Sequence, residues 1–160
     1  MRVTINRIEL LSAAKRAAAI APSSSPIKEI ACVLLETDSG SGKLTVTSTN
    51  LETSLEQKLR CVSQEEDALA VNARLLSTIL EKLPGETVEL RRNGHDPVFH
   101  LSSGDAVYTV SVFERGSYPK PEIPFPEDTV KVRLTHFSNG RHSHLCWRRI
   151  RCAAPGWGSC

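Results

Sequence analysis

The stretch ALAVNARLLSTILEKLPG, residues 68–85, is the most informative about the fold because its periodicity changes partway along. Residues 68–71 are small and apolar, as in a short buried strand, and Asn72 is a residue type that caps helix N-termini. The apolar residues that follow are spaced as on one face of an amphipathic helix: Leu76, Ile79, Leu80 and Leu83. Pro84 and Gly85 then end the helical pattern. The stretch predicts a strand followed directly by a helix.

Three further strands are predicted after this helix, over residues 87–91, 97–101 and 106–113, with the turn sequences NGHD and SSGD between them. The same order occurs at the start of the chain. Its elements are a strand over 1–6, a helix from Arg7 to before Pro22, and strands over 29–37, 43–49 and 51–61. The sequence therefore predicts an α+β fold made of two strand-helix-three-strand repeats, with two helices packed on curved antiparallel sheet.

The exposed faces of both predicted helices are mildly basic, and they are expected on the same side of the domain. Their charged residues are Arg7, Lys15, Arg16, Arg74 and Lys82, against Glu9 and Glu81. Such a surface on an otherwise acidic body suits loose, sequence-independent contact with a phosphate backbone. An ordinary solvated helix surface is the alternative from composition alone.

Charge and cysteine content divide the chain into two parts. All 18 Asp and Glu lie in residues 1–132, whereas residues 133–160 hold five arginines, three cysteines and no acidic residue. We expect a domain over 1–122, a linker over 123–132 and a poorly ordered basic Cys/Trp tail over 133–160. Five cysteines and no signal-peptide pattern predict a cytoplasmic protein with reduced thiols, and no apolar run is long enough to span a membrane.

Several segments in the body resemble the first domain of the bacterial sliding clamp, the β subunit of DNA polymerase III. They are MRVTINRIELLSAAKRA, EIACVLLE, KLTVTSTNLETSLE, AVNARLLSTILEKLPGETVEL, LSSGDAVYTVSVF and SYPKPEIPFP. The resemblance is collinear over residues 1 to 126. It implies a non-catalytic processivity factor: two chains, each with three such domains, form a homodimeric ring around double-stranded DNA. DNA polymerase III subunits and the clamp loader are the implied protein partners.

The resemblance also implies residue roles at the DNA. Arg74 matches a DNA-contacting arginine of the family. A second family arginine, in the loop after the first helix, falls on Ser24 or Ser25 here, with Lys28 nearby as a candidate substitute. The second contact is therefore missing or displaced in this sequence.

The last predicted strand, residues 106–113, corresponds to the edge that joins the other protomer's third domain in the family. Its apolar residues are Val107, Tyr108, Val110 and Val112, and we expect them to lie on an unpaired edge in a lone domain. Asp105 and Val107 stand where some members have basic residues. The second and third domains, and the peptide pocket between them, have no counterpart here. The sequence therefore predicts a truncated clamp without ring closure; a stand-alone interaction module or a non-functional truncated product is the alternative.

The tail admits three interpretations. His142, His144, Cys146 and Cys152 are four zinc-type ligands, but their spacing lacks the close pairs of structural zinc sites. Trp147 beside Arg148, Arg149 and Arg151 would suit a nucleic-acid arm. The third and favoured interpretation is a frameshift near Val132, because suitable codons for residues 146–152 read Leu-Ala-Glu-Asp-Ser-Val-Arg in another frame. This reading resembles the family motif A-E-D-S-x-R-P.

Nothing in the sequence favours catalysis, a cofactor or a metal. His95 and His100 lie in a turn and a strand without a nucleophile motif around them. The acidic run Glu65, Glu66 and Asp67 is expected to be a solvated turn. Glycine-rich phosphate-binding motifs are absent. We therefore expect a binding protein.

Overall fold

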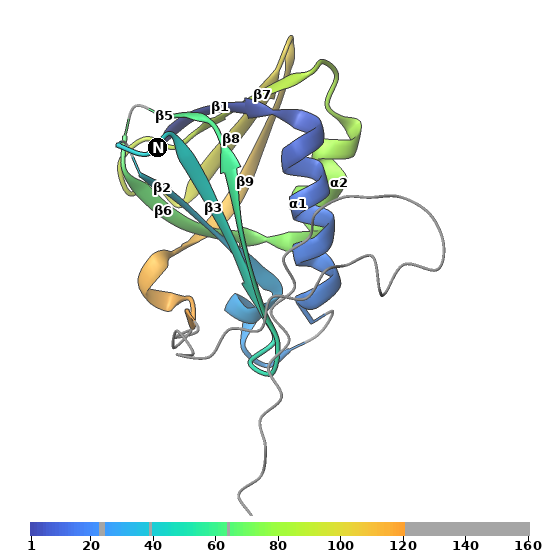
Figure 1. The fold of residues 1–160 in the computed structure, drawn as a ribbon, viewed down its shortest axis with the longest axis vertical. Helices are drawn as coiled ribbons and strands as arrows, with labels where there is room; N and C mark the ends of the chain where they lie inside the picture. The colour runs from blue at the N-terminus through green and yellow to red at the C-terminus, as the bar shows by residue number, and fades with distance from the viewer. Residues whose placement is uncertain (23–24, 39, 64, 121–160) are drawn as a thin grey trace, which may run out of the picture. The chain divides into compact units, whose positions relative to one another are not determined.

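The computed structural model describes residues 1–22, 25–38, 40–63 and 65–120, in which two helices lie against a curved antiparallel sheet (Figure 1). The predicted linker, the tail and Ser24 lie outside the described residues. The helices are α1 (Arg7–Ile20) and α2 (Ala73–Lys82), with short 3-10 turns η1 (Lys28–Ala31) and η2 (Arg115–Ser117). The strands are β1 (Arg2–Asn6), β2 (Cys32–Asp38), β3 (Lys43–Thr49), β4 (Ser54–Arg60), β5 (Val62–Ser63), β6 (Asp67–Asn72), β7 (Thr87–Arg91), β8 (Val98–Ser103) and β9 (Ala106–Glu114).

The two predicted repeats are confirmed, as β1-α1-β2-β3-β4 and β6-α2-β7-β8-β9. Their first strands are exchanged, which the sequence did not predict. The sheet order is β4-β3-β2-β6-β9-β8-β7-β1-β5, so β1 pairs with β7 of the second repeat and β6 pairs with β2 of the first. Each repeat therefore completes the sheet of the other, and the two fold as one unit.

The two ends of the sheet order are connected through the chain. β4 and β5 are the outermost strands of the order, and only Cys61 separates them in the chain. β5 pairs with β1, through Val3↔Ser63 and Thr4↔Val62. Two residues are too few to show a period of two, which is why the sequence did not predict β5.

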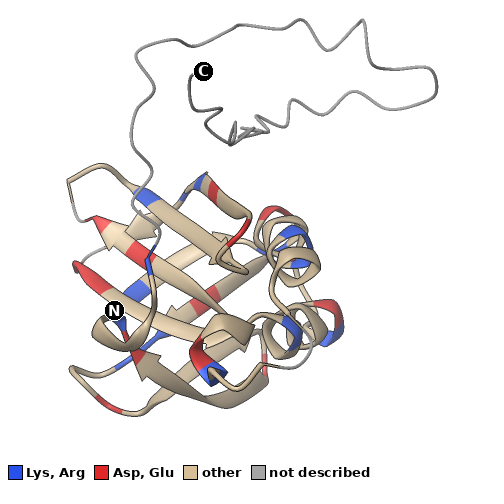
Figure 2. Ribbon diagram, turned by 90° about the horizontal axis from the view of Figure 1, so that it is seen from below, with Lys and Arg blue, Asp and Glu red and all other residues tan. Residues whose placement is uncertain are grey.

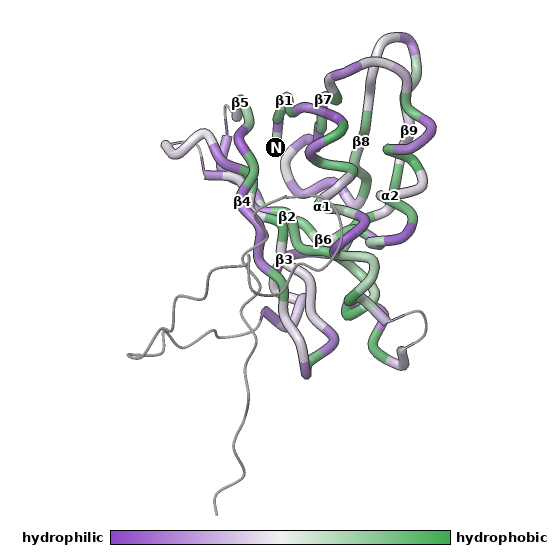
Figure 3. Tube along the Cα trace, turned by 45° about the vertical axis from the view of Figure 1, so that its right-hand side comes forward, coloured by the Kyte–Doolittle hydropathy of each residue, from purple (hydrophilic) through white to green (hydrophobic). Residues whose placement is uncertain are grey.

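The core lies between the helices and the concave face of the sheet. α1 contributes small residues, with Ala13, Ala14 and Ala17 all fully buried, whereas α2 contributes Leu76 and Leu80. The small face lets α1 approach the sheet closely, and the larger side chains of α2 fill the remaining volume. Along the sheet, central β2 is hydrophobic and terminal β4 is mostly hydrophilic (Figure 3).

Both helices begin at an asparagine cap. The Asn72 side chain accepts a hydrogen bond from the Leu75 amide at 3.0 Å, as predicted. Asn6 does the same for α1, accepting from the amides of Ile8 and Glu9. Each asparagine is the last residue of a strand, so the strand ends where the capped helix begins.

Two local predictions at strand starts are wrong. Leu51 is not on the buried face of a strand: it lies in the turn before β4 with a φ of +73° and 63% of its surface exposed. The Asn50 side chain accepts hydrogen bonds from the amides of Glu52 and Thr53, and this local turn displaces the strand pattern. Residues 29–31 belong to η1, so the strand predicted from Glu29 begins at Cys32.

Ion pairs connect the N-terminus, which precedes β1, with residues at the termini of β6, β7 and β9. The Met1 ammonium lies 3.0 Å from Asp67 Oδ2 and 3.1 Å from Glu65 Oε2. Arg92, 2% exposed, pairs with Asp67 and Glu114. The prediction of a solvated acidic turn is therefore wrong for Asp67, because burial of the two cations requires carboxylates beside them.

Candidate nucleic-acid interface

The polar faces of α1 and α2 lie on the same side of the domain. Lys15 Nζ of α1 is 2.5 Å from Glu81 Oε1 of α2, which requires the two exposed faces to adjoin. Both basic and acidic positions occur on the two helices (Figure 2). The predicted common surface is therefore formed, but part of its positive charge is neutralised within it.

Arg7 is a structural residue at the junction of the helices. Its Nε donates to the Gly85 carbonyl oxygen at 2.7 Å, and its Nη1 donates to the Leu80 carbonyl oxygen at 3.0 Å. Carbonyl groups at the end of a helix lack partners within the helix, so the guanidinium caps the end of α2. Only the rest of its hydrogen-bonding capacity is left for DNA.

Arg16 also has a partner within the protein. Its Nε donates to Gln57 Oε1 of β4 at 2.6 Å, and Gln57 in turn donates to the Ala13 carbonyl oxygen of α1 at 3.3 Å. These two hydrogen bonds link α1 to β4, a terminal strand of the sheet. With Lys15 bound to Glu81, every predicted contact on α1 is thus engaged internally.

Arg74 and Lys82 of α2 are different. Both are exposed, and neither side chain has a hydrogen-bond or ion-pair partner among the described residues. Arg74 lies in the first turn of α2, where the helix dipole is positive and attracts anions. Lys82 lies in the last turn, so the two cations mark opposite ends of the helix.

Lys28 is the first residue of η1, the short turn that precedes β2. The pairing Cys32↔Asn72 places η1, which ends one residue before Cys32, beside the residue that begins α2. Within the described part of the chain, the Lys28 ammonium has no partner either. Lys28 is therefore a second exposed cation without an internal partner, in the segment that leads into the strand beside Asn72. The sequence pointed to this loop only through the family resemblance.

β9 is not an edge strand along its whole length, which corrects the sequence prediction. It pairs with β8 from Ala106 to Ser111, and with β6 through Val112 to Glu114. Val110 is buried in the core and Val107 is 64% exposed, because neighbouring strand residues point to opposite faces. Tyr108 and Val112 are partly buried against the core. Within β9, only residues 106–111 lack a second strand neighbour among the described residues.

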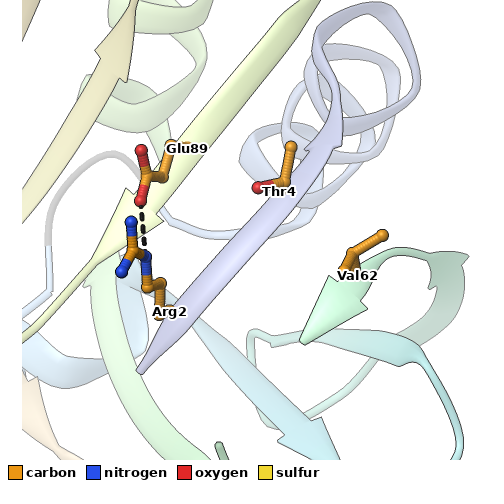
Figure 4. A pocket seen from close by; sticks show the side chains of 4 residues that line it. All are labelled: Arg2, Thr4, Val62 and Glu89. Atoms are coloured by element: carbon orange, nitrogen blue, oxygen red, sulfur yellow. Dashed lines mark hydrogen bonds and ion pairs between the residues drawn. The ribbon is translucent and has the colours of Figure 1, made fainter. Parts of the chain in front are cut away.

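The outer face of the sheet carries shallow polar depressions without catalytic chemistry. One is lined by Arg2, Thr4, Val62 and Glu89, where Arg2 Nε donates to Glu89 Oε1 at 2.8 Å (Figure 4). Its charges are paired with each other. In the described ranges, no three His, Cys, Asp or Glu side chains are placed to bind a metal ion, and no helix could cross a membrane.

The cysteine thiol nearest to helix α2 is not activated. Burial, with Glu29 nearby, raises the pKa of Cys32 to about 11. A thiol with such a pKa remains protonated near neutral pH and is a poor nucleophile. Cys32 is therefore not an activated nucleophile in this part of the domain.

Solved bacterial sliding clamps share this fold. A Pseudomonas aeruginosa sliding clamp bound to griselimycin matches with a TM-score of 0.71 and 23% identity, covering 79% of this chain and 34% of that one. The β subunit of Streptococcus pyogenes matches with a TM-score of 0.74 and 18% identity over 81% and 35%. A Caulobacter crescentus clamp matches with a TM-score of 0.72 and 22% identity over 78% and 33%. No curated protein matches this sequence significantly.

This chain spans about a third of the length of the clamps that it matches. The family model described as "DNA polymerase III beta subunit, N-terminal domain" matches residues 1–123, which include both repeats and both helices. The match to this family accounts for three features together: the two helices on a curved sheet, the twofold repeat and the shared face formed by the two helices. The chain belongs to the DNA polymerase III beta subunit family, whose N-terminal domain it contains.

Proposed function

We propose that this chain is the first domain of a DNA sliding clamp and that it contacts duplex DNA through the helical face. In this role it is a non-catalytic part of a processivity factor, which keeps a DNA polymerase III on its template. The observation behind the proposal is a set of three exposed cations without partners among the described residues: Arg74 and Lys82 on α2, and Lys28 on η1.

Few, exposed and flexible charges suit sliding. A pair of unit charges in water at 4 Å interacts by only about 1 kcal/mol, and salt screens it further. Such contacts form and break quickly and read no base, so the protein does not stop at particular sequences. Tight hydrogen bonds to base edges would oppose movement along the duplex.

The test is binding of the full chain to a fluorescent random-sequence duplex at low salt, measured by anisotropy. We expect weak binding that falls steeply as salt rises, and Arg74→Ala should weaken it about fivefold. Arg91→Ala is the matched control: Arg91 is also exposed and without a partner among the described residues, but it lies on the outer face of β7. Equal effects of the two variants would contradict the proposal.

The arginine-rich tail is the competing DNA contact, and a triple variant separates it. Replacing Arg148, Arg149 and Arg151 by Ala removes three charges that lie outside the described residues. If the triple variant abolishes binding and Arg74→Ala leaves it unchanged, the nucleic-acid arm is the functional element and the helical face is not.

A further inference from the structure

The outer face of the sheet has an open depression of about 390 Å³ over β7, β8 and β9. Its strand residues alternate with core residues such as Leu90 and Leu101, so their side chains lie on the side away from the core. None of the proposed DNA contacts lines it. The lining residues are Glu89, Arg91, Asn93, His100, Ser102 and Val107.

The strand registers place basic side chains next to one another at this depression. Arg2 lies opposite Arg91 across β1 and β7, and Arg91 lies opposite His100 across β7 and β8. Arg2 is neutralised, because its Nε donates to Glu89 Oε1 at 2.8 Å (Figure 4). Arg91 has no partner among the described residues. Like charges directly opposite each other destabilise a strand pair, so an anion bound at Arg91 would relieve this repulsion.

His100 is oriented by a neighbour on β9. Its Nδ1 lies 3.0 Å from the hydroxyl oxygen of Thr109, which is its cross-strand partner. When Nδ1 accepts the hydroxyl proton, the neutral imidazole carries its own proton on Nε2. Nε2 is then a donor for a ligand, and it stays a donor when the ring is protonated. The contact with Thr109 thus leaves a hydrogen-bond donor beside Arg91.

The other lining groups complete a set of donors for oxygen atoms. Asn93 supplies an amide and Ser102 a hydroxyl group. The guanidinium of Arg91 has parallel N–H groups that match two oxygens of a phosphate. Glu89 is the one carboxylate in the lining, and its ion pair with Arg2 reduces its repulsion of an anion. The set fits a compact anion with several oxygens better than an apolar ligand.

We propose that this depression binds the phosphate group of a small phosphate monoester, with Arg91 as its charged anchor. His100, Asn93 and Ser102 donate the further hydrogen bonds. A phosphate monoester fits better than a carboxylate because it offers three acceptor oxygens and nearly two negative charges. The inference is independent of the proposed DNA contact, since it uses other residues and its test contains no DNA.

The test is a titration of the full chain, labelled with ¹⁵N, with O-phosphoserine, followed by NMR. The depression is open to solvent, so we expect a Kd of about 1 mM. The largest shifts should occur at the amides of Arg91, Asn93 and Ser102. Arg91→Ala should weaken binding about tenfold, because it removes the charge-assisted hydrogen bonds. Serine, which lacks the phosphate, should leave the spectrum unchanged.

Two further variants separate this site from general attraction to positive charge. His100→Phe keeps a ring but removes the donor, and it should weaken binding about threefold. Arg60→Ala is the matched control: Arg60 is also exposed and without a partner among the described residues, but it ends β4 and does not line the depression. It should leave the Kd unchanged. Circular dichroism checks that each variant remains folded.

Three results would overturn the proposal. The first is an equal loss of binding in Arg91→Ala and Arg60→Ala, which would indicate attraction by net charge alone. The second is a set of shifts centred on α2, which would assign the phosphate to the helices. The third is binding of acetate as tight as that of O-phosphoserine, because the site would then not distinguish a phosphate from a carboxylate.

Discussion

The two helices come from equivalent positions in the two repeats, yet their basic residues have different roles. Arg7, Lys15 and Arg16 of α1 all have partners within the protein, whereas Arg74 and Lys82 of α2 have none among the described residues. The apolar faces differ as well, since α1 buries three alanines and one leucine, whereas α2 buries one alanine, two leucines and an isoleucine. The two repeats thus share their order of elements, whereas their helices differ in whether the protein itself engages the basic side chains.

The largest expected effect concerns the apolar faces. Leu80→Ala in α2 removes a fully buried side chain and should lower the free energy of unfolding by about 3 kcal/mol. Urea denaturation measures the change. A loss below about 1 kcal/mol would mean that the surrounding side chains collapse into the cavity and that α2 is not the principal filler of this core.

The next effect separates structural from free arginines. Arg7→Ala leaves the carbonyl groups of Leu80 and Gly85 without their donor and should cost about 2 kcal/mol of unfolding free energy. Arg74→Ala should stay within about 0.5 kcal/mol of the unchanged protein. Both are compared by urea denaturation, and equal losses would remove the distinction between the helices.

The third effect is on the salt dependence of DNA binding. Removing one cation that neutralises a phosphate should reduce the slope of log K against log salt by about 0.9. Arg74→Ala and Lys82→Ala should each show this reduction, and Lys15→Ala should show less because Glu81 competes for its ammonium. Anisotropy titrations at several salt concentrations give the slopes. If Lys15→Ala reduces the slope as much as the two α2 variants do, the predicted difference between the helices in DNA binding is wrong.

The smallest effect is the ion pair between the helices. Lys15 and Glu81 are each about half exposed, so a double-mutant cycle with Lys15→Met and Glu81→Gln should give a coupling of about 0.5 kcal/mol. High salt should reduce this coupling further. A coupling that persists in high salt would show that the pair is better shielded from solvent than its exposure indicates.

Local patterns predicted most elements because each pattern is complete within one segment. The strand over 43–49 and the helix capped by Asn72 were predicted from periodicity and capping alone. Local information failed at Leu51, where a side-chain turn displaced the strand, and at Asp67, whose partners come from Met1 and Arg92. On the exposed faces of the helices, the sequence identified the basic residues. It could not distinguish those that have a partner within the protein from those without one among the described residues.

Periodicity, caps and motifs are properties of neighbouring residues, so the two repeats, the positions of the helices and the resemblance to the family follow from the sequence. Three features required the folded structure: which first strand joins which sheet, the pairing of the last three residues of β9 with β6, and the capping of α2 by Arg7. These contacts join residues far apart in the chain, such as Arg7 and Gly85. Their partners are set by the packing of the whole domain, which no local pattern contains.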